Sequence, residues 1–294
     1  MTGIVWAEEL DETTAREVGE LLFAAREADG QPEGVTAPRG GLHLLARESG
    51  ELAGYAHLDT AGDSFGRQVA ELIVHPDHRG RGVGTRLARA LADRVPAKEL
   101  RVWAHGDHPA AARIAEREGF RRARELLIMH TPVRDDWPEP VLPPGISLRA
   151  FVPGQDEQAM IEVNARAFDW HPEQGSLSVE DLTSAEAESW FDPAGFFLAE
   201  RDGRVVGFHW TKVHPAHPRR FGGEPVGEVY VVGVDPDAQN GGLGKALTVA
   251  GLRYLRERGL GQVILYVESD NLPAIAVYGR LGFTRYRSDI QYEH

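Results

Sequence analysis

The feature that most constrains this chain is a strand, a proline-marked turn and a glycine loop that occur twice. The second copy begins with a run of β-branched residues at 229–234, and the first copy lies 160 residues earlier. A repeat of this length predicts two similar domains and not a short-period solenoid. The matched positions are Val74 with Val234, Pro76 with Pro236, Arg79 with Gln239, Gly82 with Gly242, and Gly84 with Gly244.

The composition of the loop indicates an anion site. A β-branched run favours a buried strand, and a proline ends it because proline cannot donate to the ladder. Glycines let the backbone approach a ligand closely, and the first amides of the following helix lack partners within the helix. Together these features suit a pyrophosphate-like group.

Three alternatives compete with that reading. A Rossmann site needs Gly-x-Gly-x-x-Gly directly after the strand, and here a Pro-Asp turn intervenes. A mononucleotide P-loop needs Gly-Lys-Ser/Thr, which neither copy has. The third alternative is a turn that binds nothing, and the repetition of the spacing counts against it.

The pattern along the chain predicts an α/β fold, with α+β character, in which each half holds a mixed sheet. Gly119-Phe120 matches Gly282-Phe283 at an offset of 163 residues, so the repeat extends beyond the loops. Four prolines in the last eight residues before Ile146 predict a stiff linker. The expected division is a first domain at 1–137, a linker at 138–145 and a second domain at 146–294. Strands are expected at 42–46, 52–58, 69–74, 100–104, 126–129, 196–200, 205–213, 229–234, 262–267 and 284–291, and helices at 11–28, 85–94, 109–118, 156–168, 179–189 and 271–281.

The charge and the absence of cysteine exclude several classes of function. The net charge is −13, which argues against nucleic acid and anionic membranes as partners. With no cysteine in 294 residues, disulfides, thiolate zinc sites and a cysteine nucleophile are excluded. The first residues lack a basic region followed by an apolar run, and no apolar stretch reaches the roughly 20 residues that span a bilayer. We expect a cytoplasmic monomer.

Both loops, together with Asn271-x-x-Ala274-x-x-x-Tyr278 and Gly282-Phe283, resemble the acetyl-CoA-dependent N-acetyltransferase (GNAT) superfamily. The resemblance covers nearly the whole chain twice and implies two tandem GNAT domains that bind acetyl-CoA. It also implies that strand 229–234 splays from strand 262–267 to admit the pantetheine arm. The cofactor residues that it implies are Val232, Gly233, Val234, Gln239, Asn240, Gly241, Gly242, Leu243, Gly244, Lys245, Asn271, Leu272, Pro273, Ala274, Ile275 and Ala276, and in the first copy Leu72, Ile73, Val74, Arg79, Gly80, Arg81, Gly82, Val83 and Gly84.

Four further stretches resemble the mycothiol synthases of actinobacteria, a family of tandem acetyltransferases. They begin at Glu228 (EVYVVGVDP), Gly207 (GFHWTKVHP), His171 (HPEQG) and Leu265 (LYVESDN). The resemblance implies acetylation of the cysteinyl amine of Cys-GlcN-Ins (1D-myo-inositol 2-(L-cysteinylamino)-2-deoxy-α-D-glucopyranoside), giving mycothiol and CoA. Two alternatives remain: another amine acceptor, such as an aminoglycoside, a polyamine or a protein N-terminus, and an acyl-CoA-binding module without catalysis.

Two side chains are the expected catalytic residues of the second copy. Tyr278 follows Asn271 by seven residues, and its phenol could protonate the departing thiolate. Glu228 opens the strand that leads into the loop and could accept the proton of the amine, directly or through a water. The first copy has Ala115 in place of Tyr278 and His108 in place of Asn271, so we expect it to bind the cofactor without turnover.

A polar acceptor needs directed hydrogen bonds, and the family-like stretches supply Glu173, Lys212, Glu228 and Tyr266 as substrate-binding residues. Glu33 of the first domain is a weaker candidate. A metal is not expected, because the spacing of the histidines across proline-bearing segments matches no known ligand pattern. The histidines considered are His75, His78, His209, His214 and His217.

Overall fold

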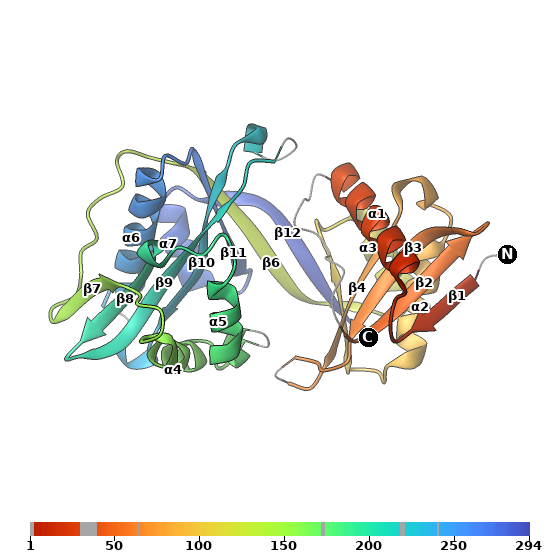
Figure 1. The fold of residues 1–294 in the computed structure, drawn as a ribbon, viewed down its shortest axis with the longest axis horizontal. Coiled ribbons are helices and arrows are strands. Elements are labelled where there is room, and N and C mark those ends of the chain that lie inside the picture. Colours follow the sequence, from red (N-terminus) through yellow and green to blue (C-terminus); the bar gives the residue numbers. More distant parts are fainter. Residues whose placement is uncertain (1–2, 30–39, 64, 172–173, 218–220, 240) are drawn as a thin grey trace. The chain divides into compact units, whose positions relative to one another are not determined.

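The computed structural model describes residues 3–29, 40–63, 65–171, 174–217, 221–239 and 241–294. The chain forms two compact units (Figure 1). Unit 1 comprises residues 1–127 and 287–294, and unit 2 comprises residues 128–286.

Unit 1 is a sheet with helices on both faces, and its strand order is β1-β2-β3-β4-β5-β12. Strands β4 and β5 are parallel, whereas β3 pairs antiparallel with β4 and β12 pairs antiparallel with β5. The elements are β1 (Gly3–Ala7), α1 (Glu12–Asp29), β2 (Leu42–Glu48), β3 (Glu51–Asp59), β4 (Gln68–Val74), η1 (Pro76–His78), α2 (Val83–Arg94), β5 (Leu100–Ala104), α3 (Pro109–Arg117) and the end of β12 (Thr284–Glu293).

Unit 2 repeats this plan with the order β6-β11-β10-β9-β8-β7. Strands β10 and β11 are parallel, and β9 pairs antiparallel with both β8 and β10. The elements are the end of β6 (Arg121–Pro132), β7 (Ile146–Ala150), α4 (Glu157–Ala167), η2 (Gln174–Ser176), α5 (Val179–Glu186), η3 (Pro193–Gly195), β8 (Phe196–Arg201), β9 (Arg204–His214), η4 (Phe221–Gly223), β10 (Val226–Val234), η5 (Pro236–Ala238), α6 (Leu243–Glu257), β11 (Gln262–Glu268) and α7 (Leu272–Arg280). The predicted α/β class with mixed sheets is confirmed.

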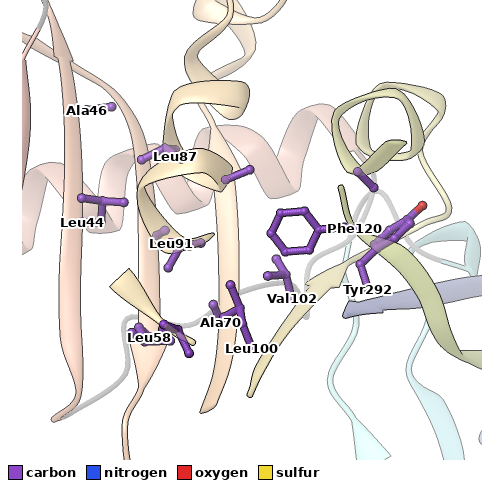
Figure 2. Packing of buried hydrophobic residues seen from close by; sticks show 14 of the residues in the cluster. Leu44, Ala46, Leu58, Ala70, Leu87, Leu91, Leu100, Val102, Phe120 and Tyr292 are labelled. Carbon is purple, nitrogen blue, oxygen red and sulfur yellow. The ribbon is translucent and has the colours of Figure 1, made fainter. Parts of the chain in front are cut away.

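The alternation of side chains along the strands builds two cores in unit 1. Leu44 and Ala46 pack with α2, and Figure 2 shows this cluster, which includes Leu87 and Leu91. The intervening Leu45 packs with α1 on the opposite face. Successive residues of a strand point to opposite faces, so both faces must be covered by helices.

The same alternation separates two faces in unit 2. Gly207 of β9 lies under Leu243 and Leu247 of α6, and an added Cβ there would come within 3.1 Å of Leu247. The next residue, Phe208, packs in the cluster that contains Met160 and Val163 of α4. Helices α6 and α4 therefore cover opposite faces of β9 and β10.

The structure differs from the sequence-based prediction at the edges of the sheets. Strands β1 and β7 were not predicted, and each lies at an edge with a single neighbour. Five-residue edge strands have little periodicity of their own, and their pairing with β2 or β8 forms them. The units also differ from the linear division, because residues 138–145 lie within unit 2 and the last eight residues lie in unit 1, where β12 pairs with β5.

Among the described residues, no helix is long and apolar enough to cross a membrane.

Candidate active site

Both glycine loops lead into their helices in the same conformation. Gly82 precedes α2 with φ +79°, and Gly242 precedes α6 with φ +83°. Residues with a Cβ rarely adopt this left-handed region, so glycine is required at both positions. Neither helix start has a side-chain cap, which leaves the first backbone amides available for an anion.

A side chain at the same repeat position braces each loop. Arg79 Nε donates to the carbonyl of Val74 at 3.2 Å, and Gln239 Nε2 donates to the carbonyl of Val234 at 3.2 Å. Each bond joins the loop to the end of the preceding strand. The Arg/Gln position of the motif therefore has a structural role in both units.

Parallel strands pair only over a short length before each loop. In unit 2, β10 and β11 are in register at three pairs, from Gly227 with Val263 to Val229 with Leu265, although both strands continue beyond them. In unit 1, the register of β4 and β5 ends at Glu71 with Trp103. The strands splay beyond these pairs, as the resemblance implied.

In unit 1 the splayed strands open into a cavity of about 730 Å³. Its walls include the glycine loop, the start of α2 and the start of α3. A cavity of this size is within the range of small-ligand sites. Of the cofactor residues expected in this unit, the lining contains Leu72, Ile73, Val74, Arg79, Gly80, Gly82, Val83 and Gly84, and it lacks Arg81.

In unit 2 the expected cofactor residues lie on the end of β10, in the loop and at the start of α7. Asn271 caps α7, since its side-chain oxygen accepts from the amide of Ala274 at 3.2 Å. His108 caps α3 of unit 1 in the equivalent way, through the amide of Ala110. Asn240 lies outside the described residues.

The predicted base Glu228 is buried, with 4% of its surface exposed. His214 Nε2 lies 2.5 Å from Glu228 Oε2, and His214 is also buried, at 6%. A buried carboxylate needs a hydrogen-bonded partner, and the imidazole supplies it. The spacing of His214 in the sequence raises only the question of a metal ligand and does not predict this contact.

The strand register places three predicted residues on one face of the sheet. Glu228 pairs directly with Lys212 on β9 and with Ile264 on β11. Tyr266 lies two residues beyond Ile264, and alternate residues of a strand share a face. We call this surface the Glu228 face; it is the face opposite α6, and it carries Trp210, Lys212, His214, Glu228, Tyr230 and Tyr266.

Tyr278 comes from α7, the helix that follows β11. Its ring meets that of Phe283 with centroids 5.9 Å apart. Burial raises the pKa of Tyr278 to about 12, because the phenolate would lose its hydration. The equivalent Ala115 of unit 1 is buried in the core and has no acid–base group.

Two predicted contacts, Glu173 and Glu33, lie outside the described residues. His209 has a structural role: its ring is fully buried, and its Nδ1 donates to the carbonyl of Leu247 at 2.7 Å. Within the described part of the chain, no group of three or more His, Asp or Glu could hold a metal ion.

Comparisons with known proteins agree with this geometry. The model of the acetyltransferase (GNAT) family matches residues 6–120 and 164–283. A protein of Amycolatopsis mediterranei named mycothiol acetyltransferase is 62% identical over 98% of this chain and 97% of its own length. Its namesake in Saccharomonospora viridis is 63% identical over 99% of both chains.

Solved structures support the fold. A GCN5-related N-acetyltransferase from Sphaerobacter thermophilus has a TM-score of 0.69 at 25% identity, covering 99% of this chain and 95% of that one. A tandem GNAT protein from the clavulanic acid biosynthesis pathway has a TM-score of 0.67 at 21% identity, covering 100% of this chain and 98% of that one.

Proposed function

The chain belongs to the acetyltransferase (GNAT) family, and its full-length relatives are named mycothiol acetyltransferase; from this premise we propose that unit 2 acetylates the cysteinyl amine of Cys-GlcN-Ins. The products are mycothiol and CoA. The enzyme is an acetyl-CoA-dependent N-acetyltransferase that acts on a small-molecule amine.

The observation that carries the proposal is the difference between the two units. Both have the glycine loop and the splayed strands, whereas the residues that stand at the positions of Glu228 and Tyr278 differ between the two copies. At the 160-residue offset Gln68 stands where unit 2 has Glu228, and at the 163-residue offset that relates Gly119 to Gly282, Ala115 stands where it has Tyr278. We therefore assign turnover to unit 2 and cofactor binding without turnover to unit 1.

Acetyl-CoA supplies the activated acetyl group, and the protein supplies its position. The amides of Gly242, Leu243 and Gly244 would hold the pyrophosphate, and the ends of β10 and β11 would hold the pantetheine arm between them. The other cofactor residues are Val232, Gly233, Val234, Gln239, Asn240, Gly241, Lys245, Asn271, Leu272, Pro273, Ala274, Ile275 and Ala276.

Glu228 accepts the proton that the amine loses as its nitrogen bonds to the acetyl carbon. Because the reference pKa of an α-amine is about 8, a carboxylate suffices, and most of the rate gain comes from orientation. Tyr278 donates its proton to the sulfur as the carbon–sulfur bond breaks. Its raised pKa keeps that proton in place at neutral pH.

Hydroxyl groups of the acceptor are bound by Lys212 and Tyr266 on the Glu228 face, together with Glu173. Glu228 also contacts the acceptor through its amine. We further propose that the protein acts as a monomer in the cytoplasm, without a metal.

The test is incubation with acetyl-CoA and Cys-GlcN-Ins, following CoA release and the mass of the product. We expect CoA and acetylated Cys-GlcN-Ins in equal amounts. Release with an aminoglycoside, a polyamine or a peptide N-terminus, and none with Cys-GlcN-Ins, would support the other-amine alternative. Binding of acetyl-CoA without release for any amine would make the protein a binding module.

A further inference from the structure

The ammonium of Lys212 lies between two aromatic rings. Its Nζ is 4.5 Å from the ring centroid of Trp190 and 5.0 Å from that of Tyr230. Both distances are within the range of attractive cation–π contacts. These contacts join three segments in one cluster, which we call the Lys212 clamp: Lys212 is on β9, Tyr230 is on the adjacent β10, and Trp190 follows α5.

Lys212 is not paired with the carboxylate that faces it. The register sets Lys212 directly opposite Glu228, but the carboxylate is hydrogen-bonded to His214 at 2.5 Å. The structure gives Lys212 no ion pair or hydrogen bond with any residue that it describes. Rings attract the charge but cannot accept three N–H bonds as oxygens do, so the donors of Lys212 are left for another acceptor.

A bulge in β10 supplies the second ring. Val229 pairs with Thr211 and Val231 pairs with Trp210, so Tyr230 is an extra residue without a partner. A bulge of this kind redirects a side chain. The ring of Tyr230 consequently lies 5.1 Å from that of Trp210, on the Glu228 face.

The rings are anchored in the core of unit 2. Trp210 stacks on the fully buried Phe196, with centroids 4.9 Å apart and planes at 1°. The ring of Trp190 also packs here, with its centroid 5.4 Å from the centroids of both Trp210 and Tyr230. The clamp on Lys212 is therefore built on packed side chains and not on a surface loop alone.

We propose that Trp190 and Tyr230 are positioning residues that hold the Lys212 ammonium apart from Glu228 and present it to hydroxyl groups of the acceptor. The face is thereby divided: Glu228 and His214 serve the reacting amine, and Lys212 serves a polyol ring such as a sugar or a cyclitol. This division makes the clamp a determinant of specificity for hydroxyl-rich amines over simple ones. The inference rests on the proposed function for the identity of the acceptor.

The test compares kcat/KM for Cys-GlcN-Ins with kcat/KM for L-cysteinamide, which has the same amine without the polyol. Trp190→Leu should raise the KM for Cys-GlcN-Ins by roughly 3- to 10-fold, the size of one cation–π contact, and leave kcat nearly unchanged. The KM for cysteinamide should not change. Trp190→Phe should restore most of the loss, because it keeps a ring.

A double-mutant cycle distinguishes positioning from general damage. In a Lys212→Met background, Trp190→Leu should have no further effect on the ratio of the two kcat/KM values. If Trp190→Leu changes this ratio equally in the presence and absence of Lys212, the proposal is overturned. Trp6→Leu is the matched control, because it removes a cation–π contact of similar length, 4.7 Å to Arg94, in unit 1.

A readout without any acceptor separates this inference from the proposed function. The ε-CH₂ protons of Lys212 should show upfield ring-current shifts in the NMR spectrum, and Trp190→Leu should remove most of that shift. Unshifted protons in the wild type would overturn the clamp. If the shifts are present but Cys-GlcN-Ins is not acetylated, the proposed acceptor is wrong. The ratio of kcat/KM values is then measured with the amine that the enzyme does acetylate and with an analogue of that amine that lacks the hydroxyl groups.

Discussion

Tyr278 and Glu228 have surroundings that suit opposite roles toward a proton. Burial raises the pKa of Tyr278 to about 12, so its phenol remains a donor at neutral pH. Glu228 is buried with His214 Nε2 2.5 Å from its Oε2, and its carboxyl oxygens are the proposed acceptor of the amine proton. At the scale of single residues, the acid and the base are thus distinguished by environment.

Tyr278→Phe should lower kcat by roughly 100-fold or more, the usual contribution of a general acid, because the ring stays and only the proton donor is lost. The affinity for acetyl-CoA should be nearly unchanged. Steady-state kinetics and calorimetry measure the two quantities. Wild-type turnover in this variant would remove Tyr278 from the mechanism.

The raised pKa of Tyr278 also predicts the alkaline behaviour of kcat. A phenol with the usual pKa near 10 would be half deprotonated at pH 10, whereas one at about 12 stays protonated. We expect no loss of kcat from this group between pH 8 and pH 10.5, measured at saturating substrate with circular dichroism to confirm folding. A decline centred at pH 10 in folded enzyme would show that the pKa is not raised.

At the scale of elements, the start of α6 is expected to be more sensitive than the start of α2. Gly242→Glu strains a residue at φ +83° and places a carboxylate where an anion should bind. We expect it to abolish turnover. Gly82→Glu makes the same change at φ +79° in unit 1 and should cost much less activity. Equal losses of kcat would mean that unit 1 also catalyses.

Helix α6 also depends on a glycine in its interior. An added Cβ at Gly251 would lie 2.0 Å from Cε1 of the buried His209, so Gly251→Ala overfills the core. We expect a loss of about 1–3 kcal/mol in the free energy of unfolding. Gly19→Ala in α1 meets nothing within 4 Å and should be neutral or stabilising. Chemical denaturation measures the free energy of unfolding of both variants. An unchanged value for Gly251→Ala would contradict the close packing of Gly251 against His209.

At the scale of the whole molecule, two histidines make the units respond oppositely to pH. Burial would lower the pKa of His105, but its hydrogen bond with Asp289 at 2.9 Å and the Glu71 carboxylate 3.6 Å from its Nε2 raise that pKa to about 10. Burial lowers the pKa of His209 to about 4. Since an unfolded histidine titrates near about 6.5, the fold favours the charged form of His105 and the neutral form of His209.

The two pKa shifts have opposite signs, so they affect the stability of the two units in different pH ranges. The stabilisation from His105 is complete below about pH 6.5 and is lost as the pH rises through about 10, so unit 1 should weaken on the alkaline side. The stabilisation from neutral His209 is present above about pH 6.5 and is lost as the pH falls toward 4, so unit 2 should weaken in acid. Thermal melts across pH measure both. His105→Gln should reduce the loss of melting temperature on the alkaline side and leave the acid side unchanged. An unchanged alkaline loss would contradict the role assigned to His105.

Much of the fold followed from local patterns. The helices and inner strands have strong periodicity, so they were predicted, with α2 beginning at Val83 and not at 85. The edge strands β1 and β7 were missed, because pairing with a neighbour creates them. Membership of the last eight residues in unit 1 depends on pairing between β12 and β5, positions nearly 190 residues apart in sequence.

The sequence by itself determined the repeat, the glycine loops and which copy has Tyr278 and Glu228 where the other has Ala115 and Gln68, because these are features of residue type and spacing. Only the tertiary structure decided what those groups contact. His214 reaches Glu228 from the adjacent strand, and Trp190 and Tyr230 enclose Lys212 from a segment beyond α5 and from a bulge in β10. Such contacts depend on register and packing between segments distant in sequence, and no local pattern encodes them.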